Sequence, residues 1–128
     1  MKVIVIRHGQ TMANIINDEG KALYTGTLNN ELTDLTEIGK KQARMLSKDS
    51  NIRSIEEVYA SNLNRAIQTA ELAKPGYEIH IIEELRERSL GIFEGKGKDE
   101  LINSVEYKKY TVDNDYNKCR NHRKVDIR

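Results

Sequence analysis

The residues best suited to chemistry lie in one octet, RHGQTMAN, which begins at Arg7. The imidazole of His8 can attack an electrophile, and Arg7 beside it supplies a fixed cation for an oxyanion. Gly9 lets the backbone approach a ligand closely, while Gln10 and Thr11 can present N–H groups and a hydroxyl at a helix start. Together these groups suit a phosphate. The Arg-His-Gly tripeptide alone would favour an incidental histidine in a turn.

A second cation, Arg65, stands in an equivalent place, within the segment YASNLNRA that leads from a predicted strand into a predicted helix. Arginine binds phosphate through a planar fork of donors, so Arg7 and Arg65 could clamp a phosphoryl group. Taken alone, Arg65 fits an exposed helix-surface arginine better.

A proton donor for a leaving alkoxide could come from the acidic segment that follows the third predicted strand. Four carboxyl groups qualify on chemistry alone, provided that burial raises the pKa of one of them: Glu83, Glu84, Glu87 and Glu94. Their spacing from the strand does not choose among them.

These candidates must be positioned by strands and helices that alternate along the chain. Apolar, β-branched runs predict strands at residues 3–6, 57–61 and 78–82, the first of them buried on both faces. Such alternation predicts an α/β fold of three layers, with a mainly parallel sheet flanked by helices. Ligands bind beyond the carboxyl ends of parallel strands, where the octet lies.

Three segments carry helix signals. The first, residues 36–47, has Thr36 as N-cap, and Leu35, Ile38, Gln42 and Leu46 share one helical face. The second, residues 63–74, presents Leu63, Ala66, Ile67 and Ala70 on one face and stops at Pro75. A third helix is predicted over residues 98–110, capped by Asp99.

Length and composition exclude several classes of protein. The 128 residues support a single domain, 1–128, and the formal net charge of +1 offers no field for nucleic acid or a membrane surface. No apolar run approaches the roughly 20 residues of a membrane helix, and the start of the chain lacks signal-peptide features. A single cysteine, Cys119, favours the reducing cytoplasm. The basic segment 107–128 is interpreted as a solvated surface.

Four ordered blocks resemble the histidine phosphatase superfamily, which includes cofactor-dependent phosphoglycerate mutases and broad-specificity phosphatases. They are RHGQT with Asn14, LTEIG with QA, YASNLNRAIQTA, and LRE with GIFEG, and they cover residues 3 to about 98. The resemblance implies a phosphoglycerate mutase-like fold.

The resemblance also implies roles that spacing could not give. His8 would be the nucleophile that forms a phosphohistidine, and Glu87 the proton donor. The implied substrate-binding residues are Arg7, Gln10, Thr11, Asn14, Thr25, Gly26 and Arg65, with Arg88 and Lys98 as weaker candidates. The substrate would be a small phosphorylated metabolite. No metal or cofactor is expected, except a 2,3-bisphosphoglycerate primer if the protein is a mutase.

One family feature is missing, because members carry a second catalytic histidine after a central strand. His122 has no strand before it and no glycine after it, so we do not expect it to fill that role, and His80 is interpreted as a structural or surface residue. The chain is therefore expected to be an N-terminal portion of a longer enzyme. Without the central strand, residues 3–6 and 58–61 would expose edges and apolar faces.

Three functions stay open at this point. The favoured one is a broad-specificity phosphatase, and the first alternative is a phosphoglycerate mutase. The second alternative is a catalytically incomplete module that binds phosphate or a partner, for instance as a homodimer through an open sheet edge.

Overall fold

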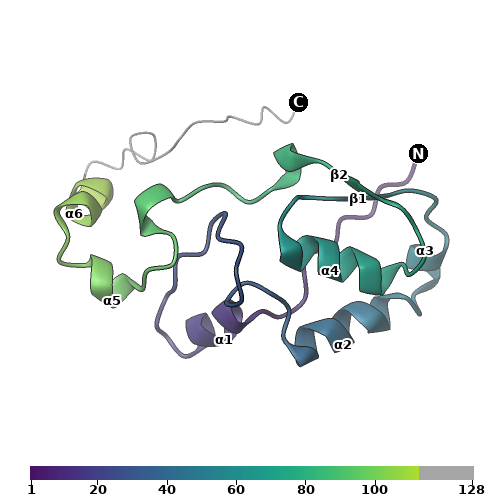
Figure 1. The fold of residues 1–128 in the computed structure, drawn as a ribbon, viewed down its shortest axis with the longest axis horizontal. Coiled ribbons are helices and arrows are strands. Elements are labelled where there is room, and N and C mark those ends of the chain that lie inside the picture. Colours follow the sequence, from purple (N-terminus) through teal and green to yellow (C-terminus); the bar gives the residue numbers. More distant parts are fainter. Residues whose placement is uncertain (113–128) are drawn as a thin grey trace. The chain divides into compact units, whose positions relative to one another are not determined.

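A computed structural model describes residues 1–112, with side chains to residue 109 (Figure 1). Its elements are α1 (Met12–Asp18), α2 (Glu37–Leu46), α3 (Ser50–Arg53), β1 (Val58–Ala60), α4 (Asn64–Ala73), β2 (Ile79–Ile81), the 3-10 turns η1 (Glu83–Leu85) and η2 (Gly91–Phe93), α5 (Lys98–Leu101) and α6 (Val105–Val112). Two compact units emerge from the contacts: Met1–Ile15 with Asn29–Arg86, and Ile16–Leu28 with the chain from Glu87 onward. The single-domain assignment stays a prediction.

The first unit is built on a parallel strand pair. β1 and β2 run in register Val58↔Ile79, Tyr59↔His80 and Ala60↔Ile81, and α4 packs on them. Val58 and Ala60 are buried while Tyr59 is exposed and stacks on His80, with ring centroids 5.1 Å apart. Two of the predicted strands are therefore confirmed, as are the α/β class and the surface position of His80.

The predicted strand at residues 3–6 is not confirmed. Within the described residues this segment pairs with no strand, and Val3 and Val5 are 70% and 91% exposed. A strand needs a neighbour to satisfy its backbone, and β1 and β2 pair only with each other here. The predicted burial of this segment on both faces is therefore wrong. The expected exposure of apolar faces is confirmed for residues 3–6 but not for residues 58–61, where Val58 and Ala60 are buried.

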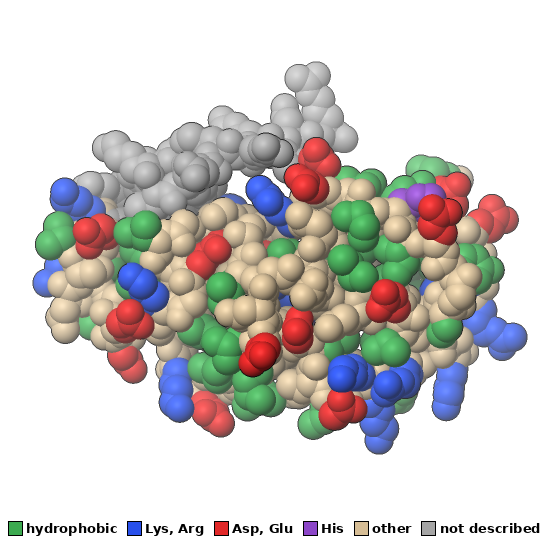
Figure 2. All heavy atoms as spheres, in the orientation of Figure 1, with side chains coloured by type: hydrophobic (Ala, Val, Ile, Leu, Met, Phe, Trp, Pro, Cys, Tyr) green, Lys and Arg blue, Asp and Glu red, His purple; other side chains and the backbone are tan. Residues whose placement is uncertain are grey.

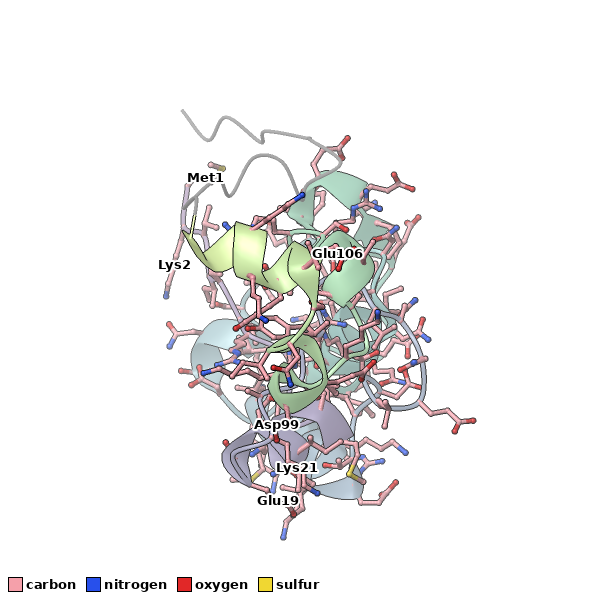
Figure 3. All side chains as sticks on the ribbon, turned by 90° about the vertical axis from the view of Figure 1, so that its left-hand side faces the viewer. Met1, Lys2, Glu19, Lys21, Asp99 and Glu106 are labelled. Atoms are coloured by element: carbon pink, nitrogen blue, oxygen red, sulfur yellow. The ribbon has the colours of Figure 1, made fainter. Side chains whose placement is uncertain are left out.

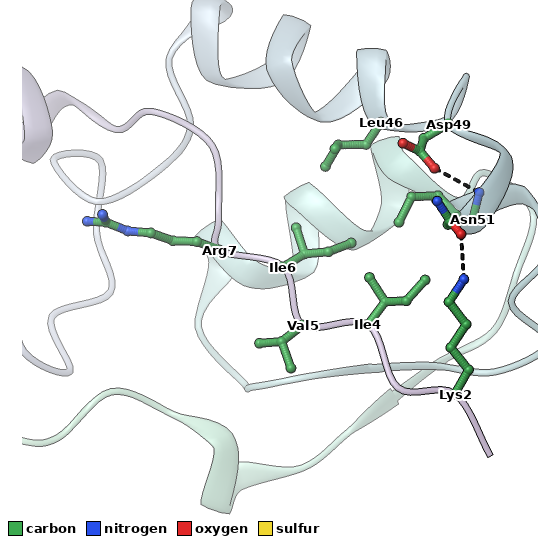
Figure 4. A pocket seen from close by; sticks show the side chains of 9 residues that line it. Lys2, Ile4, Val5, Ile6, Arg7, Leu46, Asp49 and Asn51 are labelled. Atoms are coloured by element: carbon green, nitrogen blue, oxygen red, sulfur yellow. Dashed lines mark hydrogen bonds between the residues drawn. The ribbon is translucent and has the colours of Figure 1, made fainter.

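Ile4, Ile6, Leu46 and Ile52 are among the residues that line a groove of about 540 Å³. Figure 4 shows the Lys2 side chain at one end of this groove, where its Nζ donates to Asn51. The groove gives the N-terminal segment a partial apolar contact in place of a sheet neighbour.

α2 begins as predicted. The Thr36 hydroxyl accepts from the Gly39 N–H at 3.1 Å and so caps the helix. The predicted apolar face is shifted, however, because Gly39 and Ala43 are buried while Ile38 is 57% exposed. The reason is steric: Gly39 of α2 lies so close to the backbone of Gly9 and Gln10 that a larger side chain would clash there.

α4 also shows a rotated face. Its most buried helical residues are Arg65, Thr69 and Ala73 rather than the predicted apolar set. Its first N–H, that of Asn64, donates to Asn29 Oδ1 at 2.9 Å, which replaces an N-cap side chain. At its other end Lys74 is buried, and its Nζ donates to the carbonyls of Ile52 (3.2 Å) and Arg53 (2.6 Å).

The second unit has a small aromatic core. Phe93, Leu101 and Tyr107 are buried together, with Tyr24 and Leu90 packed against them. The Tyr24 and Tyr107 hydroxyls lie 3.0 Å apart. These rings anchor η2, α5 and α6 around the loop that contains Tyr24.

The predicted helix 98–110 is divided into α5 and α6. The division falls at Ser104, whose Oγ accepts from the Tyr107 N–H at 3.1 Å and starts the second helix. Gly97, rather than the predicted Asp99, occupies the N-cap position of α5. A serine that bonds the backbone two to three residues ahead competes with continuous helix, which explains the break.

Charged side chains of both signs are interspersed on the face drawn in Figure 2. Two exposed ion pairs are present among the described residues: Lys40 with Glu37 at 2.7 Å, and Lys21 with Glu19 at 3.6 Å. Figure 3 labels the second pair, just after α1. Over residues 1–112, none of the helices has the length and apolarity that a bilayer crossing requires.

Candidate active site

The nucleophile candidate His8 is held in one tautomer by its own segment. Its Nδ1 lies 2.8 Å from the Gly9 carbonyl oxygen, and the ring is half-buried. A carbonyl only accepts, so Nδ1 is the donor of this bond, and in the neutral imidazole Nε2 then carries the lone pair. Nε2 is thereby the ring nitrogen that is chemically able to attack phosphorus.

Gly9 connects this segment to α4. Its N–H donates to the Thr69 hydroxyl at 3.1 Å, and that hydroxyl donates to the Arg65 carbonyl at 2.7 Å. Thr69 is 4% exposed, so the relay is shielded from water. The Gly9–Thr69 contact joins segments that lie 60 residues apart in sequence.

Steric constraints fix the segment on the side of α2. A Cβ added at Gly9 would lie 2.5 Å from the Gly39 carbonyl oxygen, and one added at Gly39 would lie 2.1 Å from the Gln10 carbonyl oxygen. Both distances are well below van der Waals contact. These two glycines are therefore needed for backbone to pack on backbone.

Gln10, predicted to bind substrate, is tied into this scaffold. Its N–H donates to Gln42 Oε1 at 2.9 Å, and its carbonyl accepts from the Thr36 N–H at 2.9 Å. Its side-chain Oε1 accepts from the Thr36 hydroxyl at 2.9 Å. In the structure, the second sequence block therefore holds Gln10, close in sequence to the nucleophile candidate His8.

Thr11 and Asn14, also predicted to bind substrate, bond to each other at the start of α1. Asn14 Oδ1 accepts from the Thr11 N–H (2.9 Å) and the Thr11 hydroxyl (3.0 Å). Thr11 is 2% exposed. Since Asn14 Oδ1 is committed to Thr11, the Nδ2 amide group is what Asn14 could offer to a phosphate oxygen.

The two arginines differ in environment. Arg65 is only 6% exposed, so its interpretation as an exposed helix-surface residue is wrong. Arg7 is exposed, and Figure 4 shows its side chain extending away from Ile4 and Ile6. A buried guanidinium requires compensation by acceptors or anions, which is consistent with a role in anion binding.

The structure separates the four glutamates. Glu83 and Glu84 lie exposed in η1, and Glu87 is exposed with its Oε1 accepting from the Arg88 N–H at 2.9 Å. The burial expected of the proton donor is therefore not found at these three carboxyl groups. Burial pushes the pKa of Glu94 up, but N–H groups of Thr27 and Leu90 outweigh it, so the pKa is lowered. Glu94 is therefore a poor proton donor at neutral pH.

The remaining predicted residues belong to the second unit. Thr25 opens a turn in which its carbonyl accepts from the Leu28 N–H at 2.7 Å. Gly26 is buried with φ of +45°, and a Cβ there would lie 2.4 Å from Glu94 Oε1. Arg88 and Lys98 are exposed. These residues share the second unit with Glu87, whereas His8, Arg7 and Arg65 belong to the first unit.

Thr69, Gln42 and Thr27 were assigned no role from the sequence. Thr69 could have been found, because it lies four residues after Arg65 and hence on the same helical face. Over residues 1–112, no group of three or more His, Cys, Asp or Glu side chains is arranged to hold a metal ion. His122 and Cys119 lie outside the described residues.

Comparison with known proteins tests the resemblance. The sequence model of the histidine phosphatase superfamily (branch 1) matches residues 3–125. The chain is 35% identical over 104 residues to a 2,3-bisphosphoglycerate-dependent phosphoglycerate mutase of Corynebacterium efficiens, covering 77% of this chain and 39% of that protein. It is also 35% identical over 96 residues to an adenosylcobalamin/alpha-ribazole phosphatase of Salmonella typhimurium, covering 73% and 44%.

Solved structures agree. An alpha-ribazole phosphatase from Shigella flexneri superposes with a TM-score of 0.71 at 32% identity, covering 90% of this chain and 54% of that one. The chain spans about half the length of the relatives that it matches. Sequence and fold thus agree over nearly all of this chain, which belongs to the histidine phosphatase superfamily (branch 1).

Proposed function

We propose that this protein transfers the phosphoryl group of a small phosphomonoester to water through a phosphohistidine at His8. The observation that carries the proposal is the relay from the Gly9 N–H through Thr69 to the Arg65 carbonyl. It fixes the nucleophile's neighbour against the helix that carries a buried arginine. Such preorganisation of nucleophile and cation is what phosphoryl transfer requires.

In the first proposed step, His8 Nε2 attacks phosphorus and forms a P–N bond. The P–O bond to the leaving group breaks, and Glu87 gives its proton to the departing oxygen. Arg7 and Arg65 hold the phosphoryl oxygens, with Asn14 Nδ2 as a further donor. Gln10 and Thr11 act mainly by holding the segment in place, because their polar groups bond to Thr36 and Asn14.

In the second proposed step, the oxygen of a water molecule forms a P–O bond, the P–N bond to His8 breaks, and Glu87 takes the proton of the water. Inorganic phosphate leaves and His8 returns to its starting tautomer. Thr25, Gly26, Arg88 and Lys98 are the proposed contacts to the rest of the substrate. The single Cys119 supports a reducing cytoplasm as the place of action.

A mutase is the second candidate, favoured by the 35% identity to the Corynebacterium efficiens mutase. In that case a second phosphate acceptor would replace water, and a 2,3-bisphosphoglycerate primer would load His8. Isomerisation of a phosphoglycerate that is faster than phosphate release, and dependent on the primer, would establish this candidate over the phosphatase.

The decisive experiment measures inorganic phosphate released from a generic aryl phosphate by the 128-residue chain and by its His8→Ala variant. We expect release by the first and none above background by the second. Equal release by both would contradict the proposal. Binding of inorganic phosphate without turnover, together with dimerisation, would instead establish a phosphate- or partner-binding module.

A further inference from the structure

Glu94 is the side chain on which the second unit's loops converge. The Thr27 N–H and the Leu90 N–H both donate to its Oε1, each at 2.8 Å. The Thr27 hydroxyl lies 2.9 and 3.0 Å from its two oxygens, and the Ser89 hydroxyl donates at 3.1 Å. Four donors from two chain segments thus meet on one half-buried carboxylate.

The two segments are those that carry this unit's proposed substrate and acid groups. Residues 25–27 contain Thr25 and Gly26, and residues 87–90 contain Glu87. We propose that Glu94 is a positioning residue that locks these two segments together and so fixes Glu87 relative to the substrate turn. This inference rests on the proposed function, in which Glu87 gives and takes the proton.

Gly26 shows how closely the turn is held. A Cβ at this position would lie 2.4 Å from Glu94 Oε1 and 3.0 Å from the Leu90 N. The turn backbone therefore packs directly on the carboxylate, and only glycine fits there. Nearby, the Gly95 N–H donates to the Tyr24 carbonyl at 2.8 Å, which aligns the neighbouring backbone.

A carboxylate is the group that this position requires. All four partners donate, and only an ionised carboxylate is acceptor-only at both of its oxygens. Oε1 accepts both N–H groups and the Ser89 hydroxyl, whereas Oε2 bonds only to the Thr27 hydroxyl. A glutamine of the same shape would put a neutral amide oxygen in place of the charged acceptor. Charge-assisted bonds are the stronger ones, so the lock is weakened without loss of volume.

The test compares Glu94→Gln with Glu100→Gln, a matched removal of charge from an exposed glutamate in the same unit. Amide hydrogen exchange is measured at Thr27 and Leu90, and kcat and KM are measured on an aryl phosphate. We expect faster exchange at both amides in Glu94→Gln alone. We also expect kcat to fall by about 10- to 100-fold with KM nearly unchanged, since misplaced catalytic groups cost rate rather than binding.

Unchanged exchange at Thr27 and Leu90 would overturn the inference, as would faster exchange with an unaltered kcat. If Glu94→Gln unfolds the whole chain, Thr27→Val provides the same test, because it removes only the hydroxyl bonds and keeps the N–H. It should speed exchange at Leu90 and lower kcat in the same direction. An unchanged Leu90 amide and kcat would then overturn the inference.

Failure of the proposed function has a different signature. If the wild-type chain and His8→Ala release phosphate equally, that function is wrong and with it the role of Glu94 in positioning an acid. The exchange measurement needs no turnover and still decides whether Glu94 locks the two segments. Slow exchange that depends on Glu94 in an inactive chain would leave the lock standing and the catalytic role refuted.

Discussion

Residues 9–11 and residues 25–27 both approach proposed ligand contacts, yet they are held in different ways. The first segment bonds to side chains from several elements, namely Thr69 of α4, Gln42 of α2 and the α2 cap Thr36. In the second segment and its neighbour at residues 89–90, the N–H groups of Thr27 and Leu90 both donate to one side chain, Glu94. We therefore expect the segment at residues 9–11 to tolerate in part a substitution that removes one of its hydrogen bonds. We expect it to tolerate poorly a substitution at Gly9 or Gly39, where two backbones are in direct contact.

The largest effect should come from Gly39→Ala. The added methyl would lie 2.1 Å from the Gln10 carbonyl oxygen, and neither backbone can retreat without breaking the cap at Thr36. We expect a loss of about 3 kcal/mol in the free energy of unfolding, as for a strongly overpacked site, and loss of phosphate release. Chemical denaturation measures the first and an aryl phosphate assay the second.

The control for this change is Lys41→Ala, an exposed position in the same helix, which should alter stability by less than about 0.5 kcal/mol. A Gly39→Ala protein with wild-type stability and rate would show that the segment does not depend on this close approach.

Thr69→Val should have the next largest effect. It keeps the volume but leaves the Gly9 N–H and the buried Arg65 carbonyl without their partner hydroxyl. An unsatisfied buried group costs about 1–3 kcal/mol, so we expect destabilisation in that range and a lower kcat. Thr69→Ser retains the hydroxyl and should restore most of both; equal defects in the two variants would point to packing rather than to the relay.

Gln42→Ala should have a smaller effect. Gln42 is exposed and supplies one acceptor, to the Gln10 N–H, which water can replace. The free energy of unfolding should fall by about 0.5–1 kcal/mol, with little change in kcat. A fall in kcat as large as that expected of Glu94→Gln would show that the position of residues 9–11 also depends on a single side chain, that of Gln42.

Titration of Glu94 should change the stability of the protein only in the acid range, and so it has the smallest effect at neutral pH. Burial favours the neutral form, but the donors from Thr27 and Leu90 prevail and hold its pKa below the ordinary 4.5. The stabilisation is therefore complete above pH 4.5 and is lost as the pH falls through the lowered folded-state pKa. Stability differences between wild type and Glu94→Gln, measured by denaturation across pH 2–7, should shrink only in this acid range. A difference that is constant with pH would show that the charge is not involved.

Local signals predicted the ends of α2, α4, β1 and β2 well, but they missed the N-cap of α5 and the break before α6, and they predicted the buried faces of helices poorly. The cap at Thr36 and the strands at residues 58–60 and 79–81 follow from short-range chemistry, so the sequence was sufficient for them. The buried face of α4 did not follow, because Arg65 and Thr69 are buried for what they bond to rather than for their hydropathy. A periodicity analysis that counts only apolar residues therefore predicts the wrong buried face for such a helix.

Contacts across long sequence distances account for the other differences. The run at residues 3–6 has a strand's composition, but a strand also needs a neighbour, and no described segment pairs with it. Glu94 was one acid candidate among four until its donors showed that it stays ionised. Ser89 and Leu90 lie close to Glu94 in sequence, but its other donor residue, Thr27, lies 67 residues away, so spacing alone could not reveal the whole set of donors.

The buried Lys74 has a consequence for how the first unit opens. Its ammonium group joins the end of α3 to the end of α4, which closes the intervening chain into a ring. That ring contains β1, Arg65 and Thr69. We expect loss of these two hydrogen bonds to free both ends of the enclosed chain at once, which would couple the local opening of α4 to that of β1.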